Sequence, residues 1–171
     1  MERCGSCGYL SAMDDPVAKL ADPATLYERD FYAWTQQQAA LLRTGEPRAY
    51  DWRNIVEEIE SLGRSEQSEI ENRLEVLLHH LLKWHFQPAQ RSRSWLGTID
   101  EQRRQILKTI RKSPSLKHYP SAALAEAYAD ARSAVVIETG LTIQSFPPGC
   151  PYAIGQILDR QFLPGPAEPR V

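Results

Sequence analysis

The stretch Glu66–Gln87, EQSEIENRLEVLLHHLLKWHFQ, decides the fold of this chain. Its large apolar residues follow one another in steps of four, three, one, three and one, which is the pattern of a single α-helix face. At about 1.5 Å per residue such a helix runs roughly 30 Å, the width of a small domain. We therefore predict that it is the central strut of a helical core. The residues of its apolar stripe are Ile70, Leu74, Leu77, Leu78, Leu81 and Leu82.

Two helices are expected before this stretch. Asp22 followed by proline is a helix-start signal, and Gly45 closes the helix that follows it. Asp51 caps the next helix, which Gly63 is expected to end or kink, so that Ser65 caps the central helix. The second of these helices has an apolar stripe formed by Trp52, Ile55, Val56, Ile59 and Leu62.

Three more helices are expected after the central one. Gln87 precedes a proline and ends the central helix, because that position disfavours helical backbone angles. The patterns predict a fourth helix over Trp95–Lys112, a fifth over Pro120–Thr139 and a short last one over Tyr152–Asp159. Amphipathic helices with short connections indicate an all-α fold. We predict an up-down helical bundle of four or five main helices plus a short C-terminal helix.

Length and composition suit one soluble domain. The chain has 171 residues, 42% hydrophobic residues and a net charge of −2, so it is not basic as a whole. We predict a single helical domain over residues 23–163, a poorly ordered extension over 1–22 that contains a Cys4–Cys7 pair, and a flexible tail over 164–171. No apolar run is long enough for a membrane span, and three cysteines make no disulfide framework. A cytoplasmic location is therefore expected.

Several strings along the chain carry a family resemblance. They are LYERDFYAWTQQQAALL, DWRNIVEEIESLGRSE, LLHHLLKWHFQP, RSRSW, EQRRQI, SPSL and FPPGCPY. In this order the chain resembles the bacterial DUF29 family from about Leu26 to Leu163. The resemblance implies an all-helical protein, and it brings no catalytic or binding residues with it.

The histidines suggest a metal site that the spacing does not favour. Adjacent His79 and His80 point about 100° apart on a helix, and no glutamate stands three residues before a histidine of the central stretch, as di-iron bundles require. One alternative joins Glu57 and Glu60 of the preceding helix to His80 or His85. The simpler interpretation is structural histidines and a solvated glutamate face, with no cofactor.

Charge is segregated along the chain. Between Glu46 and Val76, nine acidic and four basic residues give −5, whereas nine basic and two acidic residues between Leu77 and Tyr119 give +7. Either the two segments pair with each other, or the basic one forms a surface for a protein, a ligand or nucleic acid. The residues of this candidate basic surface are Arg91, Arg93, Arg104, Lys108 and Arg111.

Arg103 is expected at the edge of the buried face of the fourth helix, with Gln102 beside it. Buried polar groups need partners, because an unpaired one costs roughly 1–3 kcal/mol. Glu57, Glu60 and Glu138 are the carboxylates that we expect to pair with Arg103 in a network between helices.

These patterns favour a non-enzymatic helical interaction module whose surface is the segment Arg91–Lys117. The expected partner is a protein. Nucleic-acid binding through the same segment is one alternative, and a metal-dependent enzyme that uses the Glu57, Glu60, His80 and His85 set is another. No catalytic triad is apparent, and Cys150 has no histidine nearby in the sequence.

Overall fold

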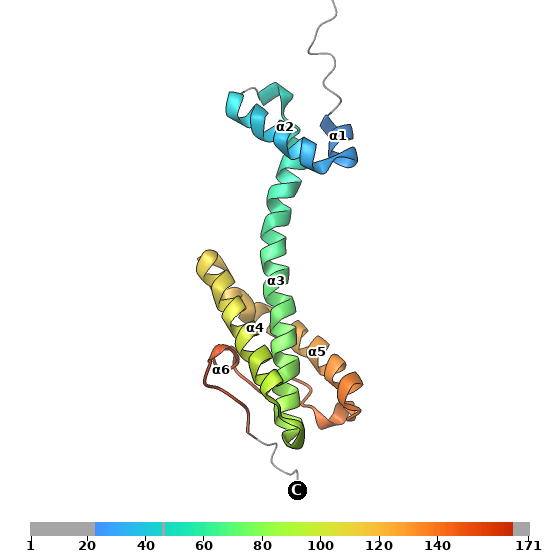
Figure 1. Cartoon of the computed structure of the whole chain (residues 1–171), viewed down its shortest axis with the longest axis vertical. Helices are drawn as coiled ribbons and strands as arrows, with labels where there is room; N and C mark the ends of the chain where they lie inside the picture. Colours follow the sequence, from blue (N-terminus) through green and yellow to red (C-terminus); the bar gives the residue numbers. More distant parts are fainter. Residues whose placement is uncertain (1–22, 46, 166–171) are drawn as a thin grey trace, which may run out of the picture. The chain divides into compact units, whose positions relative to one another are not determined.

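The structure, a computed structural model, describes residues 23–45 and 47–165 (Figure 1). Every regular element in these ranges is a helix, so the all-α bundle predicted from the sequence is confirmed. The chain falls into two compact units, one ending at Glu60 and the other beginning at Ser61. The elements in chain order are α1 (Pro23–Arg29), α2 (Phe31–Thr44), η2 (Pro47–Ala49), α3 (Trp52–Phe86), η3 (Pro88–Gln90), α4 (Arg93–Lys112), η4 (Pro114–His118), α5 (Tyr119–Thr139), η5 (Ile143–Ser145) and α6 (Ile154–Leu158).

The first unit contains α1, α2 and the beginning of α3. The sequence predicts one continuous helix from Asp22 to Gly45, but the chain interrupts it at Asp30. The Asp30 carboxylate accepts a hydrogen bond from the backbone N–H of Ala33 at 2.9 Å and so caps α2. Aspartate interrupts helices in this way because its side chain competes for backbone donors. Gly45 ends α2 as predicted, with a φ of 73° that glycine adopts without strain.

Asp51 ties the start of α3 to α2, and its predicted role as a cap is confirmed. Its carboxylate accepts the capping hydrogen bond from the backbone N–H of Asn54 at 3.4 Å, and it also accepts from Trp34 Nε1 at 3.1 Å and from Asn54 Nδ2 at 2.7 Å. Its own backbone N–H donates to Gln38 Oε1 at 2.9 Å. Trp34 and Gln38 are both buried, so this turn is held from inside the first unit.

One helix, α3, replaces the two that the sequence predicts on either side of Gly63. It runs without interruption for 35 residues. Gly63 therefore does not end a helix, and Ser65 is an interior helical residue rather than a cap. A glycine inside a helix costs about 1 kcal/mol relative to alanine. That cost is small enough for the leucine, arginine and glutamate residues around Gly63 to outweigh it.

The second unit packs α4 and α5 along the C-terminal half of α3 (Figure 1). All six predicted stripe residues of α3, from Ile70 to Leu82, have no exposed surface, which confirms the central strut. Ile99 and Ile106 of α4 belong to the same core cluster. Each such side chain contributes about 1.5–3 kcal/mol when fully buried, so this core is the main source of stability of the second unit.

The segment after α5 closes the core of the second unit. Gly140 ends α5 with a φ of 69°, as predicted. Phe146, Tyr152 and Ile157 from this segment are buried in the core cluster. The last helix, α6, is shorter at both ends than the predicted range. Pro164, the first residue of the predicted flexible tail, is buried.

Several predictions concern residues outside the described ranges. The extension over 1–22 with its Cys4–Cys7 pair and the tail residues 166–171 belong to this group. The expectation that residues 23–163 form a single domain stays a prediction beside the two compact units. In the part of the chain that the structure describes, no helix is both long enough and apolar enough to cross a membrane.

Candidate functional site

The first unit carries an exposed apolar face at the start of α3. Trp52, Val56 and Ile59 are 53%, 50% and 64% exposed. At 100° per residue they lie within about 60° of one another, so they form one stripe. We call these three residues the α3 apolar face. Of the stripe that the sequence predicts for this helix, Ile55 alone is buried, and Leu62 is exposed as well.

Contacts with α1 and α2 hold the part of α3 that carries the α3 apolar face. Tyr27 of α1 donates a hydrogen bond from its hydroxyl to the Glu58 carboxylate. This bond raises the pKa of Tyr27 to about 12. The rings of Tyr27 and Trp34 pack edge to face with their centroids 4.9 Å apart. Trp34 in turn donates to Asp51 at the cap of α3. The exposed stripe is thus presented by a helix whose opposite side is fixed.

Charged side chains border the α3 apolar face. Between Trp52 and Glu60 the helix carries three glutamates and one arginine, a net charge of −2. Glu57 and Arg53 are exposed and make no hydrogen bond or ion pair with the residues that the structure describes. Glu58 is half-buried beneath its bond to Tyr27. At 100° per residue Glu57 and Glu58 lie at least about 100° from every residue of the face, so its charged border consists of Glu60 and Arg53, one acidic and one basic residue.

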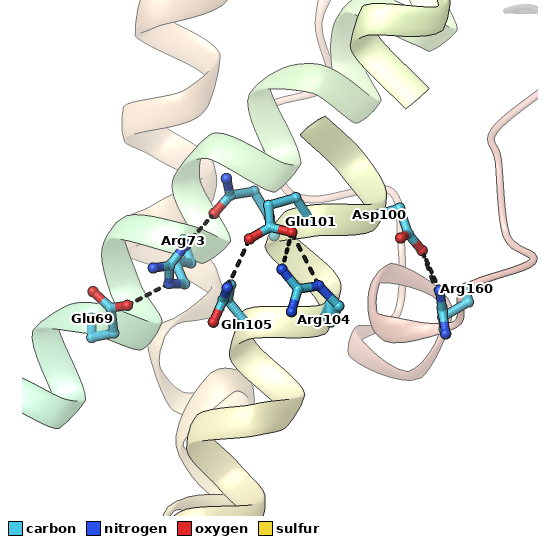
Figure 2. Close-up of polar contacts among 8 residues, drawn as sticks. Glu69, Arg73, Asp100, Glu101, Arg104, Gln105 and Arg160 are labelled. Atoms are coloured by element: carbon cyan, nitrogen blue, oxygen red, sulfur yellow. Dashed lines mark hydrogen bonds and ion pairs between the residues drawn. The ribbon is translucent and has the colours of Figure 1, made fainter. Parts of the chain in front are cut away.

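The candidate basic surface is partly neutralised. Figure 2 shows Arg104 turned toward Glu101, whose Oε2 accepts from Arg104 Nε at 3.0 Å. The same carboxylate accepts from Gln105 at 2.7 Å. The Arg104 guanidinium lowers the pKa of Glu101. Arg91 turns inward, donating from Nε to the Trp84 carbonyl at 2.8 Å and lying 4.9 Å from the Trp84 ring centroid.

The other three members of the candidate basic surface are exposed, as Arg104 is, but have no such partner. Arg93, Lys108 and Arg111 make no hydrogen bond or ion pair within the described ranges. Beside them, Lys112 donates to Glu66 of α3 at 2.7 Å. This pair joins the acidic and basic segments, so part of the charge segregation is internal pairing. Lys108 and Lys112 line a groove of about 450 Å³ between α3 and α4.

Arg103 is buried, as predicted, but its partners differ from the prediction. Its side chain is 1% exposed and donates to three backbone carbonyls of the C-terminal segment. The bonds to Ile157 and Phe162 are both 2.7 Å long. The prediction of carboxylate partners for Arg103 is therefore wrong. Free carbonyls after a short helix need donors, and the five N–H groups of a guanidinium supply them in a fixed fork. Burial lowers the pKa of Arg103.

The other members of the predicted polar network are divided between separate contacts. Gln102 of α4 accepts a hydrogen bond from Arg73 of α3 at 3.1 Å. Arg73 also forms an ion pair with Glu69 of its own helix. Glu138 of α5 binds Lys83 and His79 of α3. The Lys83 ammonium lowers the pKa of Glu138.

Glu57 and Glu60 belong to the first unit, whereas Arg103, Gln102 and Glu138 belong to the second. Within the second unit, Arg103, Gln102 and Glu138 bind separate partners and so form no common network there.

Lys83 is a buried cation that the sequence did not single out. Its ammonium lies 4.3 Å from the centroid of the Trp95 ring, and its ion-pair partner is Glu138. A buried charged residue needs such partners, because an isolated charge is costly to bury. No sequence pattern marks Lys83 as buried, because at 100° per residue it lies on the side of the helix opposite to the stripe from Ile70 to Leu82.

The histidines have separate structural partners. His80 donates from Nδ1 to the Val76 carbonyl at 2.9 Å, and His85 shares a hydrogen bond with the Tyr152 hydroxyl at 2.7 Å. Burial lowers the pKa of both histidines. Within residues 23–45 and 47–165, no three His, Cys, Asp or Glu side chains are grouped to hold a metal ion. His80 and His85, the members of the predicted metal set that lie in the second unit, thus bind separate partners.

Cys150 lies against the same buried tyrosine. Its thiol donates to the Tyr152 carbonyl at 3.4 Å. Burial raises the pKa of Cys150, which disfavours the nucleophilic thiolate. This cysteine therefore acts in packing.

Residues 26–163 match the model of a family described as Domain of unknown function DUF29. The match covers most of the 171 residues. The chain belongs to the DUF29 family. No curated protein and no solved structure matches it.

The DUF29 region includes the α3 apolar face, the cap at Asp51 and the Arg103 contacts of the second unit. The exposed stripe is thus part of the family domain rather than of a sequence appended to it. The family description assigns no activity, so the function rests on the surfaces themselves.

Proposed function

We propose that this DUF29 chain is a helical interaction module that binds another protein through the α3 apolar face. The observation that carries the proposal is the exposure of Trp52, Val56 and Ile59 on one stripe of a braced helix. Single exposed hydrophobic residues are ordinary on soluble proteins, but contiguous ones mark contact sites. A large aromatic beside aliphatic side chains is also the composition of interface centres.

The proposed site needs no catalytic group. Its residues supply apolar area and shape, and the charged border supplies orientation. We also propose a bacterial cytoplasmic location, which the family resemblance and the use of only three cysteines support.

Photo-crosslinking tests the binding function directly. A benzophenone amino acid replaces Ile59 in the full chain, which is then illuminated in a lysate of the source cells. The matched control carries the same group at Ile137 of α5, an isolated isoleucine that is 85% exposed. We expect a discrete protein adduct from position 59 that position 137 does not give. Equal adduct patterns from the two positions would refute the proposed contact site.

Nucleic-acid binding is a second candidate function, and the exposed cations Arg93, Lys108 and Arg111 favour it. Neutralising phosphates releases counterions, so such binding weakens steeply with salt. The measurement is anisotropy of a labelled duplex between about 50 and 200 mM salt, with the wild type and a Lys108→Ala/Arg111→Ala variant. A flat salt response, or the same affinity for both proteins, would exclude this function.

A further inference from the structure

The α3 apolar face has charged side chains along one flank only. At 100° per residue, Glu60 lies about 40° beyond Val56 and Arg53 lies about 60° beyond it, so both charges stand on the same flank. Both side chains are exposed, whereas the opposite flank holds buried Ile55. Seven residues separate the two charges, which is about 10 Å along the axis of α3. The flank therefore has a positive charge toward one end and a negative charge toward the other.

The apolar residues of the face match a second copy of the face that runs in the opposite direction. Consider a two-fold axis that passes through the contact at Val56, perpendicular to both helices. It places Val56 of one copy against Val56 of the other. It also brings Trp52 of each copy level with Ile59 of the other, within about 1.5 Å along the helix. The steps of four and three residues are therefore self-complementary.

The same two-fold axis pairs the charges of the flank. Because the axis is perpendicular to the helices, the charged flanks of the two copies lie on the same side of the pair. Arg53 of each copy is then level with Glu60 of the other, again within about 1.5 Å. In a parallel pair the charged flanks would lie on opposite sides, so complementary charge favours the antiparallel one. A carboxylate accepts several hydrogen bonds, so Glu60 can bind this arginine in addition to contacts within its own chain.

We infer that the protein bound at the α3 apolar face is a second copy of this chain, paired antiparallel about Val56. The inference rests on the proposed function and names its partner. Three partly exposed side chains from each copy bury less than the roughly 1,200 Å² of a stable interface, so the dimer belongs to the weak, transient class. We expect a dissociation constant of about 10–100 μM.

Sedimentation equilibrium of the full chain from about 5 to 500 μM measures this association. We expect a monomer–dimer equilibrium. Ile59→Asp should weaken it by about tenfold or more, because each copy then places a charge in the apolar contact. Ile137→Asp adds the same charge at an exposed position of α5 and should leave association unchanged. A monomer throughout this range, or a dimer that Ile59→Asp leaves intact, would overturn the inference.

Charge reversals test the antiparallel arrangement. Arg53→Glu brings two carboxylates together at each charged contact, and Glu60→Arg brings two guanidinium groups together. Each variant alone should therefore dimerise about tenfold more weakly than wild type. In an equimolar mixture, every contact between the two variants again joins opposite charges, so they should associate with each other within about threefold of the wild-type affinity. This recovery would also show that both variants are folded. If the mixture associates no more tightly than either variant alone, the antiparallel pairing is wrong.

Photo-crosslinking from position 59 distinguishes this inference from the proposed function. An adduct between two copies, formed by the purified chain alone, supports the second copy as the occupant. An adduct with a different protein, together with a monomer in sedimentation, would overturn the inference and leave the proposed function intact. If position 59 gives no adduct that position 137 lacks, the proposed function itself fails.

Discussion

The two halves of α3 have the same kind of apolar stripe and opposite surroundings. From Ile70 to Leu82, in the second unit, every residue of the stripe is without exposed surface. From Trp52 to Ile59, in the first unit, three of the four stripe residues are half or more exposed. Periodicity alone does not distinguish these halves, because it reports which side of a helix is apolar and not what covers it.

The difference lies in what each unit supplies to its part of α3. In the second unit, α4, α5 and the segment through α6 contribute to one core cluster. In the first unit, α1 and α2 engage α3 through Asp51, Ile55 and Glu58 and leave the remaining stripe open. A stripe that no described residue of its own unit covers is a surface available to another molecule.

Truncating one residue in each half gives the largest expected contrast. Leu78→Ala removes a fully buried side chain, and such changes cost about 2–5 kcal/mol because a cavity remains. Ile59→Ala removes a mostly exposed one and should change stability by no more than about 0.5 kcal/mol. Urea unfolding followed by hydrogen exchange in peptides of each unit measures both effects. If Ile59→Ala lowered the free energy of unfolding as much as Leu78→Ala does, the side chain of Ile59 would be buried rather than exposed.

The C-terminal segment that packs on the second unit can be destabilised by substituting Arg103. Arg103→Met keeps an apolar stem but leaves the carbonyls of Ile157 and Phe162 without their donor. Because unsatisfied buried groups cost about 1–3 kcal/mol, we expect a loss of about 3 kcal/mol and faster proteolysis after α6. Arg103→Lys should recover only part of this, since an ammonium cannot reproduce the fork. Full recovery with lysine would show that charge alone is needed.

The sequence predicted those features that depend on neighbours along the chain. The cap at Asp51, the helix ends at Gly45 and Gly140 and the buried stripe of α3 are of this kind. Prediction from the sequence was wrong where the partner of a side chain comes from a segment distant along the chain. Arg103 was expected near carboxylates, and only the path of the C-terminal segment determines that carbonyls reach it first.

The apolar face was missed for the converse reason. Trp52, Val56 and Ile59 have a periodic pattern typical of a packed helix, and no local signal marks their exposure among the residues that the structure describes.

Acidification should weaken the second unit before the carboxylates titrate. Burial lowers the pKa of His80 and His85, so the folded chain binds fewer protons than the unfolded chain, whose histidines titrate near about 6.5. The contribution of these two histidines to the free energy of unfolding is therefore fully present above that pH, and it is lost as the pH drops from about 6.5 toward 5. The effect should be smaller than that of Leu78→Ala, because both side chains are only partly buried.

The pH effect is measured as the urea midpoint at pH 7, 6 and 5, values at which unfolded carboxyl groups stay ionised. His85→Gln keeps a polar partner for Tyr152 and should show a shallower dependence on pH than the wild type. A midpoint that rises on acidification would contradict the sign of the argument.

Gly63 offers the smallest and most specific test, because it lies between the two halves of α3. A Cβ added there meets nothing within 4 Å, and the same is true at Gly97 of α4. If α3 is continuous through Gly63, then Gly63→Ala should stabilise the chain by about 0.5–1 kcal/mol, as alanine does inside an exposed helix. Gly97→Ala is the matched control near the start of an independent helix. The measurement is thermal unfolding with hydrogen exchange of the backbone around Gly63. If Gly97→Ala stabilises and Gly63→Ala does not, then α3 is interrupted between its halves, as the sequence first indicated.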